Sequence, residues 1–273
     1  MDRMRLAGIN LHPVKSTAIR PVQEAYVGRA GLVGDREWMV VDGDSTVVTA
    51  RGLRELFTIV ADTPSTGGPA GVDLLLNGPG MDPLEVAVPE QEAPYIEASF
   101  SGKPLTGQTV GEAADAWLRQ ALGRDDLRLV WCADPTKRAM NQTKYRPGEL
   151  AAFHDSSPVS LLSDASAAQI DTWAEGDVAP CRFRANLYVE GVAEAFAEDG
   201  WAEVAIGGAR FRVAAPIDRC VMTTIDPDTL ESGKDPLRTL AQHRRWDRKV
   251  WAAVHLAVLH PGAIAVGDEV IVS

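Results

Sequence analysis

The sequence predicts a mainly β protein of the α+β kind, with a barrel and a few helices at its periphery. Short β-type runs joined by Gly, Pro or Asp turns recur along the 273 residues, and closely spaced hairpins are typical of barrels. Helical periodicity occurs in only three places, between these runs. Because 45% of the residues are hydrophobic, the chain is long enough to bury one large core or two ordinary ones.

Paired strands are predicted wherever two apolar runs flank a short turn. The turns are Asp42-Gly43-Asp44 in 38–51, Gly-Pro-Gly in 72–88 and Gly207-Gly208 in 201–215. The last stretch, 253–273, supplies one or two more strands around its Pro-Gly and Gly-Asp pairs. A further run, 221–225, is strand-like and ends in an Asp-Pro-Asp turn.

Three segments are predicted to be helices. In 111–124, apolar residues recur at steps of three and four, and Gly123 ends the pattern. The helix in 163–173 begins with Ser163 as its N-cap. The helix in 235–245 has Asp235 as its cap, Pro236 at its first position and three basic residues at its end.

A long polar stretch, 134–158, has almost no periodicity. A connection longer than about 15 residues is usually functional or mobile, so we expect this one to cross a site or to link two lobes. A shorter stretch, 61–71, is a loop by composition.

The charge balance narrows the class of partner. The 27 Lys and Arg residues face 38 Asp and Glu residues, which gives a formal net charge of −11 and argues against nucleic acid or an anionic membrane as partner. No stretch reaches the roughly 18 apolar residues of a membrane helix, and the first residues do not resemble a signal peptide. We therefore expect a soluble, cytoplasmic protein.

The three cysteines, Cys132, Cys181 and Cys220, are widely spaced. This spacing fits neither a disulfide framework nor a structural zinc site, and an iron–sulfur cluster needs about four thiolates. If electrons pass through this protein, another chain supplies them.

Four short stretches are polar in places where simple strands would not be. Lys, Arg and Ser offer the charge-assisted donors that a phosphate needs, and Arg with Asn adds planar recognition. An isolated Lys-Ser or Gly-Asp-Arg is usually a solvated turn, and Arg184 with Asn186 fits an outward polar face as well as a lined cleft. The residues in question are Lys15 and Ser16 in 12–21, Arg36 in 31–38, Ser156 and Ser157 in 154–163, and Arg184 and Asn186, predicted on one side of a strand, in 182–191.

Cys220 has three possible roles. A free Cys often fills space in a core. Alternatively, the neighbouring Arg219 favours the thiolate, and the thiolate holds a ligand. A Cys hydrolase has the least support, because no local nucleophile signature surrounds Cys220. Its partner would have to be His12, His154, His243, His255 or His260.

Five motifs in order resemble the MOSC-domain proteins that carry a β-rich N-terminal MOSC companion domain, in the branch of the mitochondrial amidoxime reducing component and its bacterial relatives. They are V-K-S (14–16), G-L-V-G-D-R-E-W-M-V-V-D (31–42), D-S-S-P-V-S-L-L-S (155–163), R-F-R-A-N-L (182–187) and R-C-V-M-T-T-I-D-P-D-T (219–229). The resemblance implies a MOSC β-barrel with peripheral helices in 111–273 and a β-rich lobe in 1–110. Leu230 stands where the family has Gly.

The same resemblance implies a molybdenum cofactor, Mo-molybdopterin with a terminal phosphate, between the two lobes. Cys220 corresponds to the protein ligand of molybdenum, and Asp218 and Arg219 fall at catalytic positions of the metal pocket. The positions implied to bind the cofactor are Lys15, Ser16, Arg36, Ser156, Ser157, Arg184 and Asn186.

The implied function is a molybdenum cofactor-dependent oxidoreductase that reduces N-hydroxylated substrates: amidoximes, hydroxylamines and N-hydroxylated bases. Its electrons would come from a separate ferredoxin, flavin reductase or b-type cytochrome. Detoxification and pyridoxal phosphate binding are wider associations of the family. The alternative is a molybdenum cofactor or sulfur carrier, because MOSC domains also end molybdenum cofactor sulfurases. This chain lacks a pyridoxal-type domain, so it would then be a receiver or store.

Overall fold

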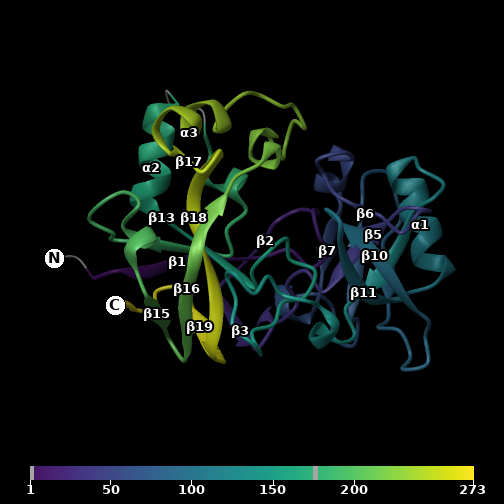
Figure 1. Ribbon diagram of the computed structural model, residues 1–273. Coiled ribbons are helices and arrows are strands. Elements are labelled where there is room, and N and C mark those ends of the chain that lie inside the picture. The colour runs from purple at the N-terminus through teal and green to yellow at the C-terminus, as the bar shows by residue number, and fades with distance from the viewer. Residues whose placement is uncertain (1–2, 175–177) are drawn as a thin grey trace.

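The structure is a computed structural model that describes residues 3–174 and 178–273. It is mainly β, as predicted, and Figure 1 shows two lobes side by side. Within the described residues, no helix is long and apolar enough to span a membrane.

A nine-stranded sheet forms the lobe on the left of Figure 1. Only β13 and β14 pair in parallel; the other pairs are antiparallel. In spatial order the strands are β2 (Arg20–Val22), β1 (Arg5–Leu11), β14 (Leu187–Glu190), β13 (Val159–Ser163), β18 (Lys249–His260), β16 (Ala209–Asp218), β15 (Glu203–Ile206) and β20 (Val270–Val272), with β17 (Arg245–Trp246) paired to β18.

The N-terminal strand belongs to this sheet and not to the other lobe. Ile9 of β1 pairs with Leu187 of β14, so the purple strand lies among strands from the C-terminal half (Figure 1). A three-stranded sheet also joins the two ends of the chain, because one of its strands comes from the C-terminal end and the other two come from the N-terminal part. Its members are β19 (Gly262–Ala265), β3 (Glu24–Gly28) and β4 (Gly31–Leu32).

Two smaller antiparallel sheets form the lobe on the right of Figure 1, and α1 packs beside them. The five-stranded sheet contains β10 (Tyr95–Phe100), β11 (Lys103–Thr109), β12 (Arg128–Trp131), β5 (Trp38–Val41) and β6 (Val47–Val48). The three-stranded sheet contains β7 (Val60–Asp62), β8 (Leu74–Asn77) and β9 (Leu84–Val86).

Each lobe has its own hydrophobic core. In the right-hand lobe Trp38, Leu56 and Leu118 are buried in one cluster, and in the left-hand lobe Leu6, Phe211 and Leu256 are buried in another. Burial of this much apolar surface is the main favourable contribution to folding. The space between the two cores is lined by polar side chains and becomes the candidate site.

The helices agree closely with the predictions. They are α1 (Glu112–Leu122), α2 (Asp164–Trp173) and α3 (Leu237–His243). Gly123 ends α1 in the left-handed conformation, and the Ser163 hydroxyl caps α2 by accepting from Ser166 N. In α3 the prediction is off by one position, because Pro236 and not Asp235 is the N-cap and Leu237 is the first helical residue; Asp235 nevertheless accepts from Thr239 N at 3.2 Å.

The predicted hairpins are also confirmed: β5 pairs with β6, β8 with β9 and β15 with β16, and β18 to β20 close the chain. The prediction of a strand at 221–225 is wrong, since a 3-10 turn, η6 (Val221–Thr224), lies there. The hydroxyls of Thr223 and Thr224 donate to the carbonyls of Cys220 and Val221, and such local bonds compete with strand pairing.

The prediction that Arg184 and Asn186 share one strand is wrong as well. Arg184 ends a 3-10 turn, η4 (Pro180–Phe183), in a left-handed conformation, and the strand begins only at Leu187. The remaining 3-10 turns are η1 (Arg54–Thr58), η2 (Pro64–Thr66), η3 (Pro135–Lys137) and η5 (Ala197–Gly200). Residues 138–158 form no helix or strand, in line with the predicted long connection.

Candidate functional site

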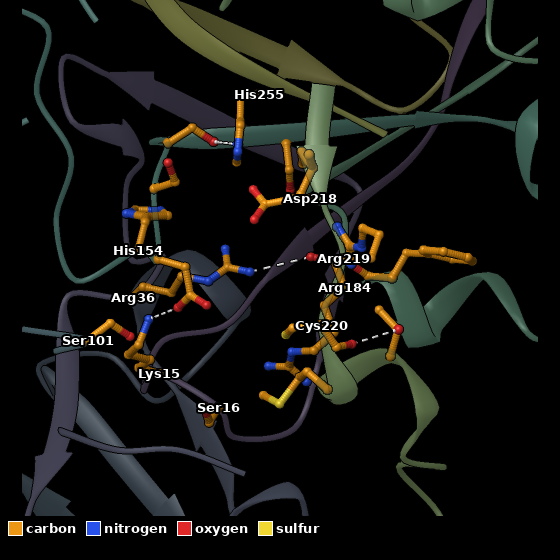
Figure 2. Close-up of a pocket in the computed structure, with 18 of the residues that line it drawn as sticks. Lys15, Ser16, Arg36, Ser101, His154, Arg184, Asp218, Arg219, Cys220 and His255 are labelled. Atoms are coloured by element: carbon orange, nitrogen blue, oxygen red, sulfur yellow. Dashed lines mark hydrogen bonds and ion pairs between the residues drawn. The ribbon is translucent and has the colours of Figure 1, made fainter. Parts of the chain in front are cut away.

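A cavity of about 410 Å³ is lined by residues of both lobes, and Figure 2 shows the side chains that meet there. The structure brings all of the site residues singled out from the sequence to this one cavity. They are Lys15, Ser16, Arg36, Ser156, Ser157, Arg184, Asn186, Asp218, Arg219 and Cys220.

The cavity is strongly cationic. Nine Lys or Arg side chains line it, against the two carboxylates of Asp155 and Asp218. The whole chain carries a net charge of −11, so this concentration of positive charge is local. A low-dielectric cleft lined by one sign of charge attracts ligands of the opposite sign. The cavity is therefore suited to an anionic ligand.

Asp35, buried at the base of the cavity, organises several lining residues. Its carboxylate accepts from His12 N at 2.7 Å and from Asn186 Nδ2 at 2.8 Å. It also forms an ion pair with Arg36 and lies 2.9 Å from His154 Nε2. Although burial opposes the shift, Arg36 and the histidine hydrogen bonds hold the pKa of Asp35 well below its usual range. The carboxylate therefore stays charged and fixes its neighbours.

Asn186 connects this base to strands of the nine-stranded sheet. Its side-chain oxygen accepts from Ser160 N, Ser160 Oγ and Arg36, and its nitrogen donates to Asn10 O and Asp35. An amide side chain has two donor hydrogens and two acceptor lone pairs, so the protein itself satisfies this group. Asn186 is thus held rigidly at the cavity wall.

Two glycines in the segment before Arg36 are required by its shape. Gly31 has a φ of +114°, and a Cβ there would lie 2.4 Å from the carbonyl oxygen of Pro158. Gly34 has a φ of +83°, and a Cβ there would lie 2.9 Å from Thr63 Oγ1. These two positions need glycine because other residues are both strained and too large. The tight path delivers Asp35 and Arg36 to the cavity.

Four lining residues that are not glycine adopt left-handed backbone conformations: Ser16 (φ 71°), Arg36 (φ 52°), Ser101 (φ 51°) and Arg184 (φ 50°). Such conformations cost roughly 1 kcal/mol or more each and gather at functional sites. Leu230, which does not line the cavity, adopts one too, with φ 61°. The backbone is therefore strained at several positions that present side chains to the cavity.

Cys220 lines the cavity between the end of β16 and η6. Its sulfur accepts a hydrogen bond from Arg51 Nε at 3.3 Å, whereas Arg219 Nη2 donates to Phe183 O at 2.6 Å. The guanidinium in contact with the thiol thus comes from the other lobe. Among the described residues, no histidine hydrogen-bonds to Cys220, so the arrangement of a thiol–histidine hydrolase is missing there.

Asp155 connects two cations that reach the cavity from the N-terminal half. It forms an ion pair with Lys15 and accepts from Arg51 Nη2 at 2.6 Å. Burial lowers the pKa of Lys15 to about 8, although Asp155 acts in the opposite direction. Burial also opposes the shift at Asp155, but Lys15 and Arg51 lower the pKa of this half-exposed carboxyl. The carboxylate neutralises part of the cationic wall beside Cys220.

Three lining side chains carry a buried polar atom that has no hydrogen-bond partner in the described part of the chain. These atoms are His154 Nδ1, Arg184 Nη1 and Arg219 Nε. Burial and the nearby Arg36 lower the pKa of Arg184 to about 9, and burial also lowers the pKa of Arg219. An unsatisfied buried donor is costly, so an anion at these guanidinium groups would be stabilising. The residues therefore fit an anionic cofactor.

Sequence reasoning missed several residues of the site. Arg51 ends the predicted hairpin segment, and no polar pattern set it apart. Asp155 and His154 lie in a segment that was singled out for its serines, and Asp35 precedes the singled-out Arg36. His255 lies in the middle of β18, where its neighbours are buried. For Asp35 and Asp155 the available signal was a charged residue directly beside a predicted site residue, whereas Arg51 and His255 have no such neighbour.

The two-lobed architecture and this cavity define a class of protein. The MOSC N-terminal beta barrel domain family matches residues 3–125, and the MOSC domain family matches residues 149–271. The chain belongs to the family of MOSC proteins that carry the MOSC N-terminal β-barrel domain.

Similar curated proteins are named amidoxime-reducing components. Mitochondrial amidoxime-reducing component 1 of Homo sapiens is 31% identical over 97% of this chain and 82% of its own length. The protein of the same name from Xenopus laevis is 32% identical over 95% of this chain and 79% of its own length. Mitochondrial amidoxime reducing component 2 of Homo sapiens is 29% identical over 97% and 82%. The similarity therefore extends across both lobes.

Proposed function

We propose that this protein is a molybdenum cofactor-dependent reductase of N-hydroxylated compounds such as amidoximes, hydroxylamines and N-hydroxylated bases. The observation that carries the proposal is one cavity that gathers nine cations and Cys220 in a strongly acidic chain. The names of the relatives, which describe amidoxime reduction, support the same reaction class. A separate protein would donate the electrons.

The residues that would hold the cofactor divide into two groups. The positive charges of Arg184 and Arg219 would attract the anionic oxygens of the cofactor, and the rest of the implied cofactor-binding set surrounds them. The sulfur of Cys220 would bind molybdenum, because a soft thiolate is a suitable protein ligand for such a metal. When bound, the molybdenum centre supplies the two-electron chemistry that cleavage of an N–O bond requires.

The other residues bind, orient and neutralise. Asp35 holds Arg36 and Asn186 in place, so their positions do not depend on the ligand. Arg51 donates to the sulfur of Cys220 and offsets negative charge there, as partners of a metal ligand commonly do. Lys15 holds a proton at Nζ at neutral pH, and the ammonium group adds to the positive charge that an anionic ligand meets.

Metal analysis of the purified protein, produced in a host that makes the cofactor, tests this proposal. The wild type should contain molybdenum and pterin, and Cys220→Ala should lose most of the molybdenum. Cys181→Ala is the matched control, since Cys181 is exposed and does not line the cavity. A full molybdenum complement in Cys220→Ala would overturn the ligand assignment.

Turnover of benzamidoxime with reduced methyl viologen separates the reductase from the carrier. We expect the molybdenum-loaded wild type to form benzamidine. Bound cofactor without reduction would instead favour a molybdenum cofactor or sulfur carrier. The cytoplasmic location, the domain boundary between residues 110 and 111 and the association with pyridoxal phosphate remain predictions.

A further inference from the structure

Carboxylate and imidazole acceptors are few in this cavity, whose other polar side chains are mainly cations and hydroxyls. Nine of its lining side chains are cations, and Lys15 and Arg51 already engage the carboxylate of Asp155. The side-chain oxygen of Asn186 is also occupied by protein donors. Asp218 and His255 are two further lining side chains that can accept. Apart from these two side chains, a ligand with N–H or O–H groups would meet mainly serine and threonine hydroxyls as side-chain acceptors.

The hydrogen bonds of His255 fix which ring nitrogen carries the proton. His255 Nδ1 lies 2.7 Å from Ser157 Oγ, and Ser157 Oγ donates to Val159 O at 2.8 Å. The hydroxyl has one proton, which is used on Val159, so Nδ1 must be the donor to Ser157. The neutral ring then has a lone pair at Nε2.

This second nitrogen is available to a ligand. His255 lines the cavity, and no group in the described residues hydrogen-bonds to Nε2. The atom is also not sealed off in the way that His154 Nδ1 is. Burial, with Lys144 and Arg219, lowers the pKa of His255 to about 3, so the ring is neutral at physiological pH. Nε2 therefore presents an acceptor to the cavity.

Asp218 stands close to this acceptor. In the pairing of β16 with β18, Ala215 lies opposite His255 and Asp218 lies opposite Trp251, so both residues belong to this pair of strands, and both line the cavity. Figure 2 shows them projecting into the same space, opposite Lys15 and Arg36. Asp218 pairs with Lys249 at 3.2 Å and is partly exposed, which leaves it accessible to a ligand.

We propose that His255 Nε2, with the Asp218 carboxylate beside it, receives hydrogen bonds from N–H and O–H groups of the substrate. The pair thereby selects N-hydroxylated compounds, which carry such donors, over N-oxides without them. This inference rests on the proposed function and names the substrate-selecting side of the same cavity. His255 is in this view a substrate-binding residue and not a cofactor ligand.

Two kinds of measurement on the molybdenum-loaded protein test the inference. One is kcat and KM for benzamidoxime with reduced methyl viologen. The other is the Kd, from NMR titration, of benzamide, which has an NH2 donor group, and of N,N-dimethylbenzamide, which has none. The wild type should bind benzamide more tightly. A hydrogen bond to a substrate group typically contributes about 10- to 100-fold, which sets the expected preference.

In His255→Phe the preference for benzamide should disappear, and KM for benzamidoxime should rise about 10- to 100-fold with little change in kcat. His255→Gln keeps an acceptor, so it should retain most of the preference for benzamide and a KM for benzamidoxime close to that of the wild type. His260→Gln, at the exposed end of the same strand, is the matched control and should resemble the wild type. If His255→Phe fails to fold, His255→Asn, whose amide is too short to reach the Nε2 position, carries the same expectation.

Equal binding of the two amides by the wild type, or an unchanged preference and KM in His255→Phe, would overturn the inference. Failure of the proposed function is a distinct result. A wild type that holds molybdenum but does not reduce benzamidoxime would contradict the reductase, while the two Kd values would still decide whether His255 selects donor-bearing ligands.

Discussion

The base and the rim of the cavity are built on opposite principles. At the base, Asp35 is fully buried and every one of its contacts is a hydrogen bond or ion pair within the protein. In the wall, Arg184 and Arg219 each retain a buried, unpartnered N–H group, and at the rim Asp218 with Lys249 is partly exposed. The satisfied groups hold the fold together, and the unsatisfied groups are left for a ligand.

Removal of the Asp35 carboxylate at the base of the cavity should have the largest effect on stability. In Asp35→Ala, Arg36 and two histidines lose their buried partner, and removal of one member of a buried ion pair typically costs about 3–5 kcal/mol. Asp218→Ala breaks a partly exposed pair with Lys249 and should cost less than about 1 kcal/mol. Urea unfolding of both variants measures the difference, and equal losses would contradict the division into base and rim.

The pH dependence of stability is the next largest effect. Burial lowers the pKa of His154 to about 4, from an ordinary value of 6.5, so the folded state binds this proton less readily than the unfolded chain. The contribution of the neutral ring is therefore complete above pH 6.5 and is lost as the pH falls toward 4. In that window each such histidine lowers the free energy of unfolding by about 1.4 kcal/mol for every pH unit by which the pH decreases.

Urea unfolding at a series of pH values tests this effect. In His154→Gln the slope between pH 4 and 6.5 should be shallower by about 1.4 kcal/mol per pH unit. His260→Gln changes an exposed histidine and serves as the control. An unchanged slope in His154→Gln would mean that the buried ring is not the group that takes up the proton.

The smallest expected effect is an increase in stability. Ser16 has a left-handed backbone at the cavity, so Ser16→Gly should raise the free energy of unfolding by up to about 1 kcal/mol. Ser45 has a similar φ of 58° but lies in the turn between β5 and β6, so Ser45→Gly is the comparison variant; it also removes the hydroxyl that accepts from Arg128 Nη2 at 3.0 Å. If the strain at Ser16 serves the proposed function, Ser16→Gly alone should also lower the molybdenum content.

The sequence predicts the regular parts of the molecule well, because they depend on local patterns. The period of α1 and the turn chemistry of the hairpins suffice for their type and approximate bounds. Residues 221–225 were misjudged because an apolar run with threonines has the composition of a strand, while the hydroxyl-to-carbonyl bonds of Thr223 and Thr224 favour a 3-10 turn.

The site residues also divide into those that the sequence predicted and those that it did not. Motif order brought Lys15, Arg36, Arg184 and Cys220 together, and all of them line one cavity. Arg51 could not be found in this way, since its role follows from two lobes meeting at Cys220 and not from its neighbours in the sequence. His255 was hidden because an aromatic residue in a buried strand resembles core, and only its bond to Ser157 reveals a directed nitrogen.

The place of β1 has a consequence for any attempt to divide the chain. A fragment that starts at residue 111 would lack β1 and β2, which extend the nine-stranded sheet beyond β14, and also β3, the partner of β19. Its exposed strand edges would invite aggregation. During synthesis β1 can pair with β2 early, but its other partner, β14, follows about 180 residues later. A circular permutant of this fragment, with residues 1–32 placed after Ser273, would restore the missing strands and allow the half with the nine-stranded sheet to be studied alone.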